Sequence, residues 1–199
     1  VAEAGGPDAP MNGGIVVVAA GNSNSDGEWY PAFYEPTLAV AATDHDDGKS
    51  SFSNFGDWVD IAAPGGESPT NPVISTLHSE QGTYGGDTWA GTSMAAPHVA
   101  GAAALIASNQ PGFTAEQVQR RLIATGDEPI ASEPIGPRVN AFAALSVNET
   151  PLDPIVDLAV VMQNSVTPGD VVNLQWTATG EAGSEGRATG YDLRYSTGG

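Results

Sequence analysis

The sequence predicts an α/β domain that is followed by the beginning of an all-β module. Three observations predict this: short continuous apolar runs between glycine-rich turns, two helical patterns after them, and a change to alternating hydrophobicity near residue 150. We therefore expect an α/β domain over residues 1–147, a linker over 148–154 and an incomplete all-β sandwich over 155–199.

Three apolar runs are the expected strands of the first domain. They lie at residues 14–20, 37–43 and 59–63, and Pro64-Gly65 ends the last of them. Continuous apolar runs, as opposed to alternating ones, are typical of strands that are buried on both faces of a parallel sheet. The runs therefore predict a mostly parallel sheet.

Two helices are expected after these strands. Alanine and leucine recur at helical spacing over residues 93–108, and Pro97 falls in the first turn, where its missing N–H loses no internal hydrogen bond. Thr114 and Gln117 have the spacing of a capping box, which predicts a second helix through about residue 124.

Beyond Pro151 the apolar residues alternate with polar or small ones in three segments, 156–160, 172–176 and 191–195. This period of two indicates strands with one buried face. A complete sandwich needs about seven strands and about 100 residues, so residues 155–199 are expected to form only its first strands.

Composition narrows the possible partners. Acidic residues outnumber basic ones by 24 to 6, a net charge of −18 that argues against nucleic acids and anionic membranes as partners. No apolar run approaches the roughly 20 residues of a membrane span. The absence of cysteine excludes disulfides, thiolate metal sites and a cysteine nucleophile.

The segment at 91–101, Gly-Thr-Ser-Met-Ala-Ala-Pro-His-Val-Ala-Gly, is the candidate for chemistry. It places Ser93 in the first turn of the expected helix, where free N–H groups and the helix dipole favour negative charge. A developing oxyanion would be stabilised there. The alternative is that the serine merely caps the helix.

This segment closely resembles the nucleophile motif of the subtilisin family of serine proteases. Further segments resemble the family in its own order along the chain, at residues 16–22, 50–56, 59–65 and 138–141. The resemblance covers about residues 12–147 and is strongest to the thermitase-type branch. It implies a subtilisin-like, mostly parallel sheet flanked by helices. The tail over 155–199 resembles a truncated fibronectin type III module.

The resemblance implies a serine endopeptidase that acts on protein or peptide substrates. Ser93 matches the nucleophile that forms the acyl-enzyme, and Asn22 matches the asparagine whose side-chain amide binds the oxyanion beside the Ser93 N–H. No cofactor is implied for the chemistry. An extracellular or cell-surface location is implied by the family resemblance and by the appended module, and not by any signal segment in these residues.

The sequence departs from the family in its catalytic triad. Neither the Asp-Thr-Gly or Asp-Ser-Gly motif nor the His-Gly-Thr motif occurs in these 199 residues. The family has both before the oxyanion strand, so we expect them upstream of Val1 and expect the chain alone to be inactive. His98 follows Ser93 by five residues, about 140° around the helix, and is expected to be a hydrogen-bonded packing residue. His45 and His78 carry no specific signal.

The resemblance also implies that structural calcium is possible. Asp60 matches a position that contributes a carboxylate to a family calcium site, together with main-chain oxygens near Ala32 and Tyr34. The acidic cluster at 44–47 is a second candidate, or simply a solvated turn.

Two other functions stay open. One is a catalytically dead relative that binds peptides through the same cleft, although both Ser93 and Asn22 are present. The other is an adhesive or surface module that acts through the C-terminal sandwich, and deletion of residues 151–199 would distinguish it from a protease.

Overall fold

The computed structural model describes residues 13–69, 71–76 and 89–146, and in addition the strand backbone at 84–85, 159–161 and 173–175. The chain divides into two units, Val1–Val147 and Asn148–Gly199. Each unit is described by itself.

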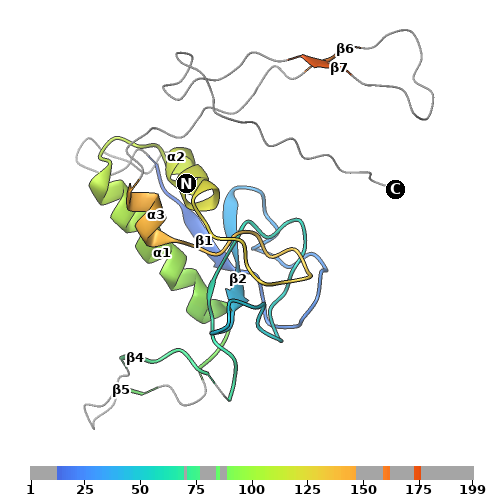
Figure 1. Cartoon of the computed structure of the whole chain (residues 1–199), viewed down its shortest axis with the longest axis vertical. Helices are drawn as coiled ribbons and strands as arrows, with labels where there is room; N and C mark the ends of the chain where they lie inside the picture. Colours follow the sequence, from blue (N-terminus) through green and yellow to red (C-terminus); the bar gives the residue numbers. More distant parts are fainter. Residues whose placement is uncertain are drawn as a thin grey trace, which may run out of the picture. The chain divides into compact units, whose positions relative to one another are not determined.

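A parallel three-stranded sheet lies in the first unit (Figure 1). Its strands are β1 (Val16–Ala19), β2 (Thr37–Thr43) and β3 (Ile61–Pro64), with β2 in the middle. The predicted parallel pairing is confirmed in both ladders. The third strand begins two residues later than expected because the N–H of Val59 bonds to the Gly56 carbonyl in a turn.

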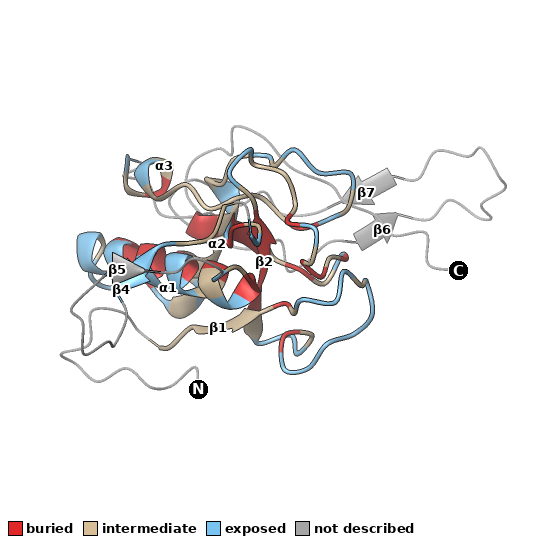
Figure 2. Cartoon of the chain, turned by 90° about the horizontal axis from the view of Figure 1, so that it is seen from below, coloured by how far each residue is buried: buried red, intermediate tan, exposed pale blue. Residues whose placement is uncertain are grey.

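In the described part of the chain three helices follow, α1 (Thr92–Asn109), α2 (Ala115–Ala124) and α3 (Ala141–Ser146). Helix α1 contacts all three strands and both other helices. Figure 2 shows buried residues in β2 and along part of α1, where the core forms. This core joins the sheet to the helices through large apolar side chains, namely Leu38, Val40, Ile61, Val99, Ile106, Val118 and Leu122.

The predicted capping box at the start of α2 is present. The Thr114 hydroxyl accepts the Gln117 N–H at 3.2 Å, and the Gln117 side chain accepts the Thr114 N–H at 2.9 Å. Two N–H groups that helix geometry leaves free are thereby satisfied.

We expect Thr114→Ala to lower the free energy of unfolding by about 1 kcal/mol, because the Gln117 N–H loses its acceptor. Denaturant unfolding of the chain measures this. Thr114→Ser keeps the hydroxyl oxygen, so its free energy of unfolding should stay within about 0.5 kcal/mol of the parent value. Equal losses in both variants would contradict the cap.

The segment after α2 returns to the sheet and is held by a polar network. Arg138 pairs with Asp47 and, at 2.8 Å, with Asp127. The amide of Asn140 donates to both Asp127 oxygens at 3.0 and 3.1 Å. The hydrogen bonds from the Asn140 amide, and to a smaller extent those from Arg138, hold the pKa of Asp127 below its usual range. The network fixes the segment beside β3, where the Val139 N–H bonds to the Ala62 carbonyl at 2.8 Å.

Two short antiparallel ladders complete the described structure. In the first unit β4 (Ser75–Thr76) pairs with β5 (Tyr84–Gly85), and in the second unit β6 (Ala159–Val161) pairs with β7 (Asn173–Gln175). The rest of the fibronectin type III-like fragment expected over 155–199 lies outside the described residues. In the described ranges, no helix has the length and apolarity needed to cross a bilayer.

Candidate active site

Ser93 lies in the first turn of α1 and is exposed. The N-cap residue of α1 is Gly91, and no side chain caps the helix. The capping role considered for Ser93 is therefore wrong. Within the described part of the chain, neither the hydroxyl nor the N–H of Ser93 makes a hydrogen bond. Both groups are therefore available to a ligand at the positive end of the helix.

Asn22 follows β1 and lies against the beginning of α1. Its Oδ1 accepts two hydrogen bonds from Thr92, from the N–H and from the hydroxyl, each at 2.9 Å. The Thr92 hydroxyl in turn accepts the Gly21 N–H at 3.1 Å. These bonds join two segments that are 70 residues apart in the sequence.

The bonds from Thr92 also determine which way the Asn22 amide faces. Because the oxygen is held by the helix, the Nδ2 group points away from Thr92. Among the described residues it has no hydrogen-bond partner. A Cβ on Gly91 would lie 3.4 Å from Nδ2, at an ordinary van der Waals distance, so Gly91 adjoins this donor.

Thr92 is a residue of the site that the sequence did not predict. It is fully buried, and its hydroxyl both donates and accepts. The only signal in the sequence was a threonine beside the candidate serine, which resembles an ordinary residue at a helix start.

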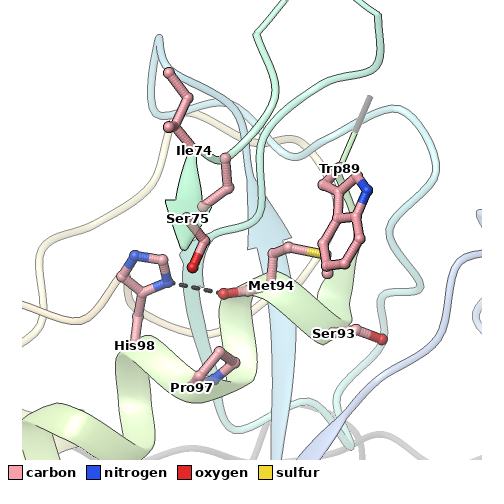
Figure 3. Close-up of a pocket in the computed structure, with 8 residues that line it drawn as sticks. Ile74, Ser75, Trp89, Ser93, Met94, Pro97 and His98 are labelled. Carbon is pink, nitrogen blue, oxygen red and sulfur yellow. Dashed lines mark hydrogen bonds between the residues drawn. The ribbon is translucent and has the colours of Figure 1, made fainter. Parts of the chain in front are cut away.

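None of the described histidines contacts Ser93. His98 donates its Nδ1–H to the Met94 carbonyl at 2.8 Å, and Figure 3 shows its ring and the Ser93 hydroxyl on opposite sides of Met94. The expected hydrogen bond of His98 is present, but the expected packing role is wrong, because the residue is exposed and lines the pocket that adjoins Ser93. His45 contacts Asn71 and Asp46 instead. His78 lies outside the described residues.

A pocket of about 330 Å³ adjoins Ser93 (Figure 3). Its walls are mostly apolar, and they come from β4 and the residues just before it, from the residues before α1 and from the first turns of α1. The lining residues are Val73, Ile74, Ser75, Trp89, Ser93, Met94, Pro97 and His98. A pocket of this size and character accommodates an apolar side chain of a ligand that lies across Ser93.

Asp60, the candidate calcium ligand, lies beside β2. Its Oδ2 accepts the Ala39 N–H at 2.7 Å. Burial, and to a smaller extent repulsion from Glu35, raise the pKa of this carboxyl, while the bond from Ala39 opposes the shift. A bound cation would offset both the cost of burying this carboxylate and its repulsion from Glu35.

The other suggested calcium ligands are already bonded within the protein. The main-chain oxygens of Ala32 and Tyr34 accept the Thr37 hydroxyl at 3.0 and 2.9 Å. In the 44–47 cluster, one Asp44 oxygen accepts the N–H of Gly48 at 2.9 Å and closes a turn. No group of three His, Asp or Glu side chains in the described ranges is placed to hold a metal ion.

The structure thus places an exposed serine in the first turn of a helix, beside a parallel sheet and an amide donor. Comparison with known proteins then identifies the family. The model of the subtilase family (peptidase S8) matches residues 4–157, and the chain belongs to this family.

Individual relatives agree with this assignment. The chain is 44% identical to thermitase of Thermoactinomyces vulgaris over 119 residues, which is 58% of this chain and 38% of thermitase. It is 46% identical over 123 residues to subtilisin NAT of Bacillus subtilis subsp. natto, covering 59% of this chain and 30% of that protein. The chain thus spans well under half the length of the curated relatives that it matches.

A solved structure of a protease from Pseudoalteromonas arctica PAMC 21717 has the same fold. It superposes with a TM-score of 0.60 at 35% sequence identity. The match covers 68% of this chain and 43% of that one. The subtilisin-like fold predicted for the first domain is therefore confirmed.

Proposed function

We propose that this chain is part of a serine endopeptidase in which Ser93 is the nucleophile and Asn22 the oxyanion donor. The observation that carries the proposal is the pair of bonds from Thr92 to the Asn22 oxygen. They leave the Asn22 amide nitrogen free near a helix start whose serine is exposed and unbonded among the described residues.

The chemistry would proceed in two acyl-transfer steps. A histidine takes the Ser93 hydroxyl proton as Oγ attacks the scissile carbonyl, and the negative charge that forms on the carbonyl oxygen is bound by Asn22 Nδ2 and the Ser93 N–H. The histidine then protonates the leaving amine. Water attacks the acyl-enzyme in the same way, which releases the acid and regenerates Ser93. No cofactor takes part.

We propose that the histidine and the aspartate that orients it lie outside these 199 residues, in the remainder of the subtilase domain. The described histidines make other contacts, and the chain covers only 38% of thermitase. Helix α1 supports this proposal, because it also exposes apolar or small residues that another part of a domain would cover, namely Ala100, Gly101, Ala104 and Leu105.

The substrates would be proteins or peptides, with an apolar side chain in the pocket beside Ser93. Family membership supports an extracellular location. We further propose that residues 155–199 begin an all-β, fibronectin type III-like module, for which the antiparallel β6–β7 ladder is the support.

A fluorophosphonate probe, which reacts only with an activated serine, tests the proposed function in the complete protein. Labelling found by mass spectrometry on Ser93, and lost in Ser93→Ala, is the expected result. The 199-residue chain alone should stay unlabelled. A complete protein that is folded, unlabelled and still binds peptides would be a pseudoprotease. Labelling at another serine would overturn the assignment of Ser93.

We also propose that Asp60 binds calcium, with Glu35 contributing negative charge, and Asp60→Asn tests it. The pKa of Asp60 is higher in the folded protein than in the unfolded chain, so the fold favours the protonated carboxyl. The contribution of Asp60 to stability is therefore present below the unfolded pKa and is lost as the pH rises through the folded pKa. Asparagine keeps the acceptor for Ala39 and removes the charge.

At about pH 7 without calcium, Asp60→Asn should therefore unfold at a higher temperature than the parent, and the difference should shrink as the pH is lowered. Added calcium should raise the midpoint of the parent and leave that of the variant unchanged. The exposed Asp57, changed to asparagine, is the control. Identical behaviour of the Asp57 and Asp60 variants would sink the calcium proposal.

A further inference from the structure

Asn54 is a fully buried polar residue in the connection between β2 and β3. The oxygen and the nitrogen of its side-chain amide both bond to the backbone of the loop at residues 20–25. Nδ2 donates to the Ala20 carbonyl at 2.9 Å, and Oδ1 accepts the N–H groups of Ser23 and Ser25 at 2.9 and 3.2 Å. These bonds lie on both sides of Asn22 along the chain.

The backbone of Asn54 adds a further bond, from its N–H to the Gly21 carbonyl at 2.9 Å. Gly21 has φ of +107°, and a Cβ there would lie 2.5 Å from the Asn54 amide nitrogen. The loop thus turns sharply around the Asn54 side chain. Every residue from Ala20 to Ser25, except Asn22 and Asn24, is bonded to Asn54.

We propose that Asn54 is a positioning residue for Asn22. This inference rests on the proposed function, in which the Asn22 amide binds the oxyanion. Thr92 sets the rotation of the Asn22 amide, and Asn54 sets the backbone from which the Asn22 side chain projects. An oxyanion donor contributes only when it is held in place before the charge forms.

The buried serines near Asn54 provide a matched control. Ser50 is also fully buried, and its hydroxyl donates to the Gly66 carbonyl at 2.7 Å, away from the 20–25 loop. Ser50→Ala and Asn54→Ala each remove buried hydrogen bonds from the same connection. Only the second removes bonds on either side of Asn22.

The test is a double-mutant cycle in the complete protein. Asn54→Ala should lower kcat by about tenfold or more with KM within about twofold, because a transition-state contact is disturbed. In the Asn22→Ala background the same change should alter kcat by less than about twofold, since the donor is already gone. Ser50→Ala should leave kcat unchanged in both backgrounds.

Asn54→Asp provides a second variant should the alanine variant not fold. It keeps an acceptor for Ser23 and Ser25, loses the donor to Ala20 and places a carboxylate oxygen beside the Ala20 carbonyl, so kcat should fall in this variant too. Additive losses from Asn22 and Asn54, or no loss from Asn54, would overturn this inference alone. Full activity of Ser93→Ala or Asn22→Ala would instead overturn the proposed function.

A spectroscopic measurement decides the point independently of activity. In the ¹⁵N-labelled complete protein, Asn54→Ala should shift the NMR signals of the Asn22 side-chain NH₂ group. It should also remove the protection of the Ser23 and Ser25 backbone amides from hydrogen exchange. Ser50→Ala should do neither. Unchanged Asn22 signals in folded Asn54→Ala would show that Asn54 does not position Asn22.

Discussion

If the proposed function holds, replacing Ser93 with alanine is expected to lower kcat of the complete protein by about 10⁶-fold, a magnitude established in subtilisin and carried over from it. The hydroxyl makes no hydrogen bond within the described part of the chain, so its removal costs the fold little. Residual hydrolysis above the rate in water should remain, because the oxyanion donors are still present.

Steady-state hydrolysis of a peptide substrate measures this effect. Ser108→Ala is the matched control, since Ser108 is an exposed serine near the other end of the same helix, and it should keep full activity. Thermal unfolding midpoints of the two variants should agree. Activity that survives in Ser93→Ala would show that the nucleophile is elsewhere.

Replacing Asn22 with alanine is expected to lower kcat by about 10²- to 10³-fold with little change in KM, a magnitude also established for this donor in subtilisin. The amide nitrogen would contact the oxygen only after it becomes charged, so ground-state binding is spared. The Asn22 side chain is exposed, which limits the cost to folding.

Thr92→Ser is the control for the Asn22 result, because it retains the hydroxyl that donates to the Asn22 oxygen. It should keep activity within about threefold of the parent. Thr92→Val removes the donor and the acceptor for Gly21 and should lose much of what Asn22→Ala loses. A rise in KM with kcat unchanged would contradict an oxyanion role for Asn22.

Local signals in the sequence predicted the elements well. The run at 37–43 coincides with β2, and the capping box at Thr114 and Gln117 forms as expected. Both signals depend on neighbours within a few residues. The third strand was placed too early, because Val59 continues the apolar run while its N–H closes a turn to Gly56.

The candidate site was only partly predictable. Ser93 and Asn22 could be named from motifs, but the bonds that orient Asn22 come from Thr92 and, through the loop, from Asn54. Those partners are 70 and about 30 residues away in the sequence, and neither has a pattern of its own. Hydrogen bonds over such separations depend on the assembled sheet and are not visible in one sequence.

The hydrogen bonds that join Gly21 and Asn22, just after β1, to Thr92 in α1 affect the order in which the protein folds. Gly21 and Thr92 are 71 residues apart, so closing that loop has a large entropic cost that the sheet and core contacts must offset first. High contact order of this kind slows folding. We expect the Asn22 amide to reach its place late, so that an incompletely folded chain carries the serine without an oriented donor. Peptide cleavage would then begin only with the native state.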